Sequence, residues 1–296
     1  MPIDLHAHTT VSDGGDSPSE LIDAAAAAGL SAIAVTDHDN DAGCDEAVAR
    51  GGTVGIEVVR GVEISCDVDD LADRGFTPTG RPTMHLLGYF IPEHDNPLSS
   101  ALAQLQHHRA NRNRIMVERL NELGVDVTFE EIEKEAGGPG AQIGRPHFAK
   151  VLVRHGAVSD FQSAFDEYLA KGAKAYVGRK LLRPAEAVEL MRSAGVVPVL
   201  AHPFTLNLAP GELERFVDVL VDAGLAGIEG YHGDRTEEQQ TVVRDLAERK
   251  RLVVSGGSDY HGAMVPERKL PGGRCGVFVP DDVLEALRAE AGSREF

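Results

Sequence analysis

Two short motifs near the start of the chain constrain its fold and chemistry more than any other feature. The first, from Asp4 to Asp13, places His6 and His8 two residues apart and an aspartate five residues later; the second is the Asp-His-Asp run at residues 37–39. Residues i and i+2 of a β-strand point to the same face, so the two imidazoles project together. Paired imidazoles with carboxylates close behind are typical of a divalent-metal site. The motifs therefore favour a metal-dependent hydrolase.

The bulk properties fit a globular protein with an acidic surface. The 296 residues carry a net charge of −18, which argues against nonspecific binding to long nucleic acid. No apolar run is long enough to span a bilayer, so we expect no membrane partner. Cys44, Cys66 and Cys275 are scattered and form neither a disulfide framework nor a CxxC motif. We therefore expect a cytoplasmic protein, and the sequence leaves its oligomeric state open.

Short β-branched runs alternate with helical patterns at both ends of the chain, which is typical of parallel βα units. Strands are predicted at residues 3–6, 32–35, 58–64, 84–90, 196–201, 227–231 and 252–255, with helices at 18–28 and 41–50 between the first three. Seven strands indicate an α/β barrel one strand short of the common eight. Five successive helices are predicted at 98–123, 129–136, 146–155, 161–170 and 184–194. We expect residues 1–94 and 196–296 to form the barrel, and 95–195 to form a helical insert that caps the active site.

Metal-binding residue types recur at the predicted strands. Glu63 closes the third strand, His85 lies in the fourth, His202 follows the fifth, and Asp259 and His261 follow the seventh. In a parallel barrel the carboxyl ends of the strands converge on one face, so these distant positions would meet. The candidate ligands exceed the need of one ion and nearly suit three. They are His6, His8, Asp13, His38, Glu63, His85, His202, Asp259 and His261.

Six motifs, in this order, resemble those of the PHP (polymerase and histidinol phosphatase) family. They are Asp-Leu-His6-Ala-His8, Thr-Asp37-His38-Asp39, Gly-Val-Glu63-Ile-Ser, His85-Leu-Leu-Gly-Tyr, Ala-His202-Pro and Ser258-Asp259-Tyr-His261. The resemblance implies a distorted seven-stranded barrel that holds three divalent ions and hydrolyses phosphoesters. It implies three ligand sets: His6, His8, Glu63 and Asp259; Glu63, His85 and His202; and Asp13, His38 and His261. Asp13 stands where some relatives have histidine, a change that could shift the metal preference.

The predicted insert carries a weaker resemblance. Its run Gly144-Arg145-Pro146-His147-Phe148-Ala149 resembles the stand-alone branch of the family. Members of that branch remove the 3′-phosphate from 3′,5′-nucleotide bisphosphates, and others degrade short RNA from the 5′ end. Residues 95–195 hold 14 lysines and arginines against 13 aspartates and glutamates, whereas the remainder holds 15 against 34. This balance suits either a positive wall that faces an anionic substrate or helices with mixed charged faces.

These observations lead to a mechanistic expectation. Two or three divalent ions (Mn²⁺, Fe²⁺ or Zn²⁺) would neutralise the phosphate, and a hydroxide bridging them would attack phosphorus. Asp259, His261 and His232 are the candidate catalytic residues, and Arg145, His147 and His232 the candidate substrate contacts. Arginine presents a planar fork that matches phosphate oxygens. Asp37 and Asp39 would either orient ligand imidazoles or cap the following helix.

Several functions remain open at this stage. The leading hypothesis is hydrolysis of a phosphomonoester of a small AMP-like nucleotide, most simply the 3′-phosphate of a 3′,5′-nucleotide bisphosphate, with phosphate as a product. The alternatives are a 5′-3′ exonuclease on short RNA, a histidinol-phosphate phosphatase, an amidohydrolase-type C–N hydrolase and a non-catalytic PHP regulatory module. The chain has no tryptophan and only 5 tyrosines and 10 phenylalanines. This composition favours a nucleotide or a short oligomer over a long single strand.

Overall fold

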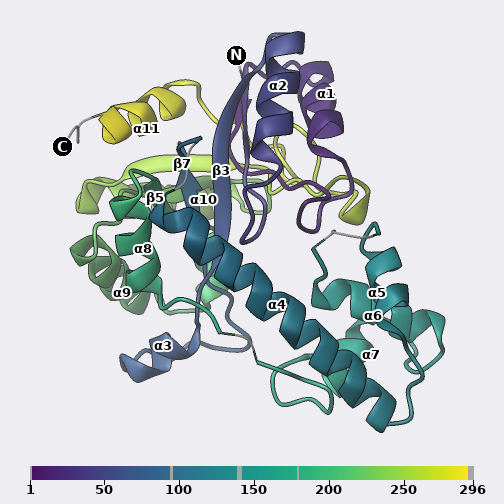
Figure 1. Ribbon diagram of the computed structural model, residues 1–296. Helices are drawn as coiled ribbons and strands as arrows, with labels where there is room; N and C mark the ends of the chain where they lie inside the picture. The colour runs from purple at the N-terminus through teal and green to yellow at the C-terminus, as the bar shows by residue number, and fades with distance from the viewer. Residues whose placement is uncertain (1, 94–95, 139–141, 179, 293–296) are drawn as a thin grey trace.

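Seven strands form one sheet, with neighbours in chain order. The computed structural model describes residues 2–93, 96–138, 142–178 and 180–292 (Figure 1). Its strands are β1 (Ile3–Asp4), β2 (Ala32–Val35), β3 (Glu57–Ser65), β4 (His85–Tyr89), β5 (Val197–Leu200), β6 (Gly227–His232) and β7 (Val253–Gly257). All seven predicted strands are confirmed, and each end lies within two residues of its predicted position.

The parallel pairing expected from the βα pattern holds for every neighbouring pair except those of β4, which runs against its neighbours. It pairs antiparallel with both β3 and β5, while the other neighbouring pairs are parallel. His85 is therefore the first residue of β4, and the register places it opposite Ser65 at the end of β3. An apolar run predicts a strand but carries no information about its direction. The reversal still delivers His85 to the expected edge, from the amino end of its strand.

The sheet nearly closes into a barrel through contacts between its first and last strands. The Leu5 amide donates to the Gly256 carbonyl over 3.1 Å, and Ala7 forms an isolated parallel bridge with Tyr260. A Cβ at Gly257 would lie only 2.4 Å from the His6 backbone nitrogen, so this approach requires glycine. Beyond Asp4 the chain lies between both edges of the sheet, because the Thr36 amide, directly after β2, donates to the Ala7 carbonyl over 2.9 Å. His6 and His8 therefore reach the interior from an irregular segment.

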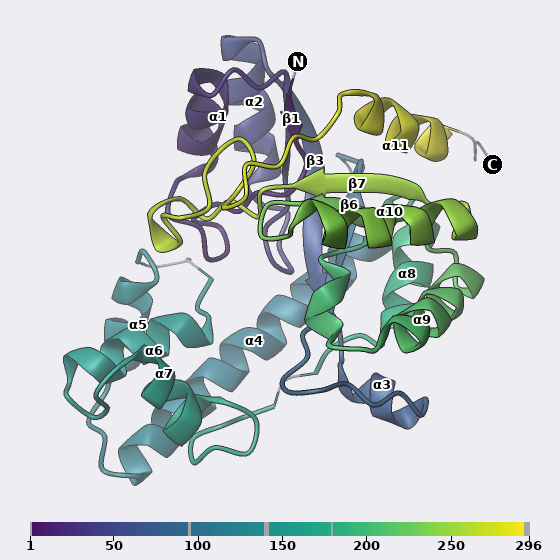
Figure 2. The same cartoon turned by 180° about the vertical axis from the view of Figure 1, so that it is seen from behind.

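Helices cover the outside and one end of the barrel (Figures 1 and 2). α1 (Pro18–Ala27) and α2 (Cys44–Val54) pack together on β2, through an apolar cluster that includes Leu21, Ile33 and Ala47. α3 (Asp69–Asp73) follows β3, and α9 (Pro210–Asp222) and α10 (Glu237–Lys250) flank β6 in the chain. α11 (Asp282–Gly292) packs on β7. α2 begins three residues after its predicted start, because the Cys44 amide first bonds the Asp41 carbonyl in a turn.

The helices between β4 and β5 divide between two apolar cores. They are α4 (Pro97–Glu122), α5 (Phe129–Glu135), α6 (Arg145–Arg154), α7 (Phe161–Ala164) and α8 (Pro184–Ser193). Four agree with the sequence to within one residue, whereas the predicted helix at 161–170 becomes α7 followed by a π-helical turn, Phe165–Leu169. α8 and the first half of α4 pack on the barrel. Residues between Met116 and Ala175 share a separate core, and we call this region the helical lobe.

In Figures 1 and 2 the helical lobe gathers at the far end of α4, away from β5 and β6. The division of the chain at residues 95 and 195 stays a prediction, and residues 94–95 lie outside the described part of the chain. Among the described residues, no helix combines the length and apolar character needed to cross a membrane.

Candidate metal centre

Glu63 stands at the centre of a buried cluster of imidazoles. β3 carries its side chain to the open end of the barrel, where it is only 1% exposed. One carboxylate oxygen, Oε1, faces two imidazoles, and the other, Oε2, faces three. The nitrogen–oxygen distances are 2.9 Å to His85, 2.8 Å to His202, 3.0 Å to His38, 3.2 Å to His8 and 3.4 Å to His6. A carboxylate in this position is suited to bridge neighbouring cations.

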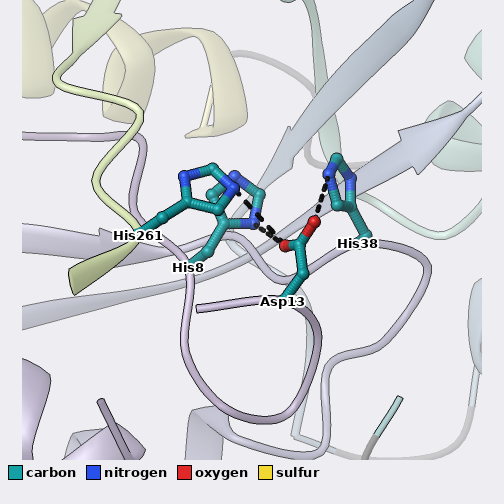
Figure 3. Close-up of side chains that lie close together, drawn as sticks. All are labelled: His8, Asp13, His38 and His261. Atoms are coloured by element: carbon teal, nitrogen blue, oxygen red, sulfur yellow. Dashed lines mark ion pairs between the residues drawn. The ribbon is translucent and has the colours of Figure 1, made fainter. Parts of the chain in front are cut away.

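A second group surrounds Asp13, as Figure 3 shows. The Asp13 carboxylate lies 3.4 Å from His261 Nε2, 3.7 Å from His38 Nε2 and 3.8 Å from His8 Nδ1. Ligand atoms of these four residues lie within 4.8 Å of one another. The third ligand set implied by the family resemblance thus comes together from three separate loops. His8 joins it and also faces Glu63.

Asp259 completes the cluster on the side of β7. Its Oδ1 lies 3.3 Å from His8 Nε2 and 3.6 Å from His6 Nε2. The residue adopts a positive φ of 54°, which non-glycine residues rarely adopt and which turns its carboxylate toward the imidazoles. His202, at φ 25°, shares this feature. Strained backbone at two candidate ligands is common at functional sites.

The candidate ligand atoms are arranged as they would be around bound cations, and not as hydrogen-bonded pairs. His6 Nε2, His8 Nε2 and His38 Nδ1 are buried and, within the described part of the chain, accept or donate no well-formed hydrogen bond. Each nevertheless points at a carboxylate oxygen 3.0–3.6 Å away. Imidazole nitrogens and carboxylate oxygens are the ligands that Zn²⁺, Mn²⁺ and Fe²⁺ accept. The nine predicted ligands therefore form groups that could hold metal ions.

The pKa shifts in the cluster indicate that bound cations would replace protons on the imidazoles. Burial disfavours the charged form of Glu63, yet the imidazoles of His38, His85 and His6 hold the pKa of its carboxyl well below its usual range. Burial likewise opposes protonation of His8, but the carboxylates of Asp259 and Glu63 raise the pKa of His8 to about 10. Without metal, protons on the imidazoles supply the positive charge that the carboxylates require. Metal binding must displace them.

Glu229 contacts two candidate ligands and was not predicted from the sequence. It lies in β6, is 1% exposed, and accepts from His6 Nδ1 over 2.8 Å and from the His202 amide over 2.6 Å. It thereby fixes which nitrogen of His6 faces the cluster. The one available signal was a glutamate inside an otherwise uncharged buried strand, Gly227–His232.

Neither Asp37 nor Asp39 caps α2, and a role for them in orienting ligand imidazoles stays a prediction. Asp37 accepts from the Thr9 amide at 2.8 Å and from the Ser12 hydroxyl at 2.5 Å, so it holds the loop that carries Asp13. Asp39 accepts from the Ser65 amide at 2.8 Å and pairs with Arg109 of α4 at 2.5 Å. α2 begins beyond both residues, with Gly43 at its N-cap and no side-chain cap. Both carboxylates therefore hold segments that lie next to candidate ligands in place.

His232 lies above the cluster and lines the cavity that is described below. One of its ring nitrogens is free to act as a hydrogen-bond donor. The Asp234 amide donates to its Nδ1 over 3.0 Å, so the proton of the neutral ring sits on Nε2. Nε2 is buried, lies 3.9 Å from both Glu229 and Asp259, and has no hydrogen-bond partner among the described residues. Burial lowers the pKa of His232 against the opposing charges of Glu229 and Asp259. A neutral N–H therefore faces the Glu229 and Asp259 carboxylates, from a ring that lines the cavity above the cluster.

A cavity of about 200 Å³ opens above the cluster, and we call it the catalytic cavity. His38, Glu63, His85, His202, His232, Asp259 and His261 line it together with Arg235 and Arg268. Arg268 pairs with Asp259 Oδ2 at 2.5 Å and with Asp234 at 2.7 Å, leaving Asp259 Oδ1 toward His8. The sequence analysis missed both arginines, because each lies in a loop without a recognisable motif.

Arg145 and His147 lie at the start of α6, outside the residues that line the catalytic cavity. The predicted turn into a helix is confirmed, with Gly144 at the N-cap. His147 Nδ1 accepts from the Gly144 amide over 3.0 Å, and the negative charge of Asp13 opposes the lowering of the pKa of His147 by burial. Arg145 reaches the Leu169 carbonyl at 3.4 Å. Their contact with substrate stays a prediction.

Comparison with known proteins supports the same chemistry. A 3′,5′-nucleoside bisphosphate phosphatase of Chromobacterium violaceum is 34% identical over 259 residues, covering 88% of this chain and 87% of the relative. A 5′-3′ exoribonuclease of Haemophilus influenzae is 33% identical, covering 87% and 89%. A phosphoribosyl 1,2-cyclic phosphate 1,2-diphosphodiesterase of Eggerthella lenta is 30% identical, covering 88% and 94%.

Solved structures agree over almost the whole chain. An amidohydrolase from Chromobacterium violaceum, with bound sulfate and no metal, matches with a TM-score of 0.80 at 31% identity, covering 98% of this chain and 96% of the other. A proposed metal-dependent phosphoesterase from Bifidobacterium adolescentis matches with a TM-score of 0.78 at 29% identity, covering 97% and 96%. The PHP domain model matches residues 4–177. Together with the histidine–carboxylate cluster, these matches establish that the chain belongs to the PHP domain family and is a metal-dependent phosphoesterase.

Proposed function

We propose that this protein hydrolyses the 3′-phosphate of a 3′,5′-nucleoside bisphosphate and releases a nucleoside 5′-monophosphate and phosphate. The observation that carries the proposal is the Glu63-centred cluster at the floor of a small cavity lined by two arginines. The phosphatase of Chromobacterium violaceum, which acts on this substrate class by name, supports it. So does the sulfate in the similar structure, because sulfate has the shape and charge of a phosphate.

We propose three metal positions, with the ligand sets that the family resemblance implies. One would be held by His6, His8, Glu63 and Asp259, a second by Glu63, His85 and His202, and a third by Asp13, His38 and His261. Two or three ions of Mn²⁺, Fe²⁺ or Zn²⁺ suit this mixture of nitrogen and oxygen ligands. When bound, such ions neutralise the phosphate charge and make a nucleophile available from water near neutral pH.

The protein's own groups then divide the remaining work. His232 holds its proton on Nε2, toward the cavity, and would donate it to the sugar oxygen as the phosphorus–oxygen bond breaks. Glu229 and Arg268 position His6 and Asp259, so that their free ligand atoms face the cluster. Arg235, whose Nε has no partner among the described residues, would bind a phosphate oxygen. Asp259 and His261 stay catalytic candidates through the metals they would hold.

Arg145 and His147 would contribute from the helical lobe. Both lie at an α6 N-terminus, which favours anions, and Asp13 is close enough to influence the pKa of His147. We propose that they contact the substrate at the side of the third metal position. We also propose a cytoplasmic location, because Cys44, Cys66 and Cys275 are all free thiols.

A second candidate is 5′-3′ exonuclease activity on short RNA, which the 33% identity to the Haemophilus influenzae exoribonuclease favours. Both activities would use the same cluster. They differ in whether the catalytic cavity must admit a chain that continues beyond one nucleotide.

The test is phosphate release by Mn²⁺-reconstituted protein from adenosine 3′,5′-bisphosphate, AMP, histidinol phosphate and a 5′-phosphorylated RNA trinucleotide. We expect rapid release from the bisphosphate, with AMP as the product. Faster conversion of the trinucleotide to mononucleotides would make the protein an exonuclease. Faster release from histidinol phosphate would make it a histidinol-phosphate phosphatase, and no turnover with metals bound would contradict the proposal.

A further inference from the structure

A second cavity, of about 280 Å³, lies between α4, α5 and the segment that precedes α6. We call it the lobe cavity. Its lining includes Asn40, Arg109, Asn113, Arg114, Phe129 and Gln142. None of these residues is a candidate metal ligand, and none lines the catalytic cavity. The proposed reaction has so far given this cavity no role.

The two cavities are neighbours along one short segment of chain. His38 lines the catalytic cavity and Asn40 lines the lobe cavity, and two residues of extended chain span at most about 7 Å. Two side chains from the α4–α6 region fasten this segment. Gln142 Nε2 donates to the His38 carbonyl over 2.7 Å, and Arg109 pairs with Asp39 at 2.5 Å. The metal centre and the lobe cavity therefore lie within the length of one nucleotide of each other.

The lobe cavity offers a flat surface for a planar group. The Arg114 guanidinium lies over the Phe129 ring, with its carbon 4.6 Å from the ring centroid. Guanidinium planes and aromatic rings are the surfaces on which proteins stack nucleobases. Arg114 is largely exposed, so a planar ligand can reach this pair without unfolding the lobe.

The same cavity also offers hydrogen-bond acceptors that lack donors. Asn113 Nδ2 donates to the Ile143 carbonyl over 3.0 Å, and Gln142 Nε2 is engaged with His38. Their oxygens, Asn113 Oδ1 and Gln142 Oε1, have no hydrogen-bond partner within the described part of the chain. A buried acceptor without a donor is costly, so a ligand that supplies N–H groups is favoured. Exocyclic amino groups of adenine, guanine and cytosine are such donors.

We propose that the lobe cavity binds the nucleobase of the substrate, stacked on Arg114 and Phe129, and favours bases that carry an exocyclic amino group. This deepens the proposed function and rests on it. The rival position is Phe204, which Arg235 covers at 5.4 Å beside the catalytic cavity. That cavity is smaller, and charged side chains that suit the phosphate dominate its lining. The unpaired amide oxygens favour the lobe cavity.

Binding of product-like ligands to the Mn²⁺-loaded protein tests the proposal without depending on turnover. We would titrate AMP, UMP and ribose 5-phosphate by calorimetry into the unmodified protein, Arg114→Gln and Phe129→Leu. Base stacking predicts that AMP binds at least about ten-fold more tightly than ribose 5-phosphate, with UMP between them. Either substitution should bring AMP to within about three-fold of ribose 5-phosphate.

Arg215→Gln is the matched control, because Arg215 lies 5.4 Å over the Phe76 ring and neither residue lines the catalytic cavity or the lobe cavity. The AMP preference should survive it. Equal affinity for AMP and ribose 5-phosphate in the unmodified protein would overturn the proposal. Survival of the preference in both Arg114→Gln and Phe129→Leu would do the same, and its loss only in Arg235→Gln would place the base beside Phe204.

Phosphate release from adenosine 3′,5′-bisphosphate, measured in parallel, separates the two proposals. Release without any AMP preference would leave the phosphatase standing and refute the base site. An AMP preference that depends on Arg114, without release from the bisphosphate, would leave the base site standing and refute the phosphatase.

Discussion

At the open end of the barrel, charged and titratable side chains are buried against one another, whereas the helical lobe buries an apolar core. Glu63, Glu229 and His6 are each at most 1% exposed, and their hydrogen bonds and ion pairs run to other polar groups. In the lobe, Phe148, Leu152 and Ile132 are equally buried among apolar neighbours. The buried side chains at the barrel end are thus suited to bind metal ions, whereas those of the lobe stabilise its fold. We expect metal binding to depend on the first region, and substrate preference on the second.

The largest effect on metal binding is expected from Glu63→Gln. The change removes a charge that faces five imidazoles, so we expect bound metal to fall and kcat/KM to drop by more than about 10³-fold. Metal content by mass spectrometry and phosphate release would be measured together. Glu57→Gln, at the exposed start of β3, is the control and should behave as the unmodified protein. Full metal occupancy in Glu63→Gln would remove Glu63 from the centre.

A core substitution in the lobe should lower the stability of the protein and leave its metal content unchanged. Phe148→Ala empties a fully buried position, and we expect it to lower the free energy of unfolding of the lobe by about 3–5 kcal/mol. Metal content should stay unchanged, because no predicted ligand lies in the lobe. Phe161→Ala is the matched control, since that ring is 45% exposed. Chemical denaturation followed by circular dichroism measures the free energy of unfolding of both variants. Loss of metal from folded Phe148→Ala would show that the two regions are not separate.

Glu229→Gln probes how the cluster is held in place. The amide can still accept from the His202 backbone but no longer carries the charge that faces His6, so we expect metal affinity to fall by about 10–100-fold. Competition with a chelator would measure the affinity. Glu238→Gln, on the exposed face of α10, should change nothing. An unchanged affinity in Glu229→Gln would mean that the barrel interior orients His6 without it.

A pH series tests whether protons and metals compete at the barrel end. The folded pKa of His8, about 10, lies above its usual 6.5, so protonated His8 stabilises the metal-free protein below pH 6.5, and this contribution is lost as the pH rises through 10. Metal binding must displace that proton. Apparent Mn²⁺ affinity should therefore rise with pH, by up to about ten-fold per unit for each proton displaced. Calorimetry in two buffers of different ionisation enthalpy counts the protons, and a count of zero would contradict the arrangement.

The fold could be predicted closely from the sequence, because β-branched runs and helix caps are local signals. Ser17 and Glu20, for instance, form the expected capping box at α1. The direction of β4 could not be predicted, since strand direction depends on a connection and not on a residue pattern. The structure brings all nine candidate ligands together because they lie at strand ends or in the loops that follow, as motif spacing suggested. Glu229, Arg235 and Arg268 escaped prediction, because their roles depend on neighbours that lie far away in the sequence.

We propose that divalent ions occupy the space between Glu63, Asp259 and the surrounding imidazoles. Anomalous diffraction from crystals grown with Mn²⁺, recorded at the manganese edge, tests it most directly. We expect peaks about 2.0–2.2 Å from the carboxylate oxygens of Glu63 and Asp259, and a further peak beside Asp13. Anomalous density absent from Glu63, in crystals where manganese binds elsewhere on the protein, would contradict it.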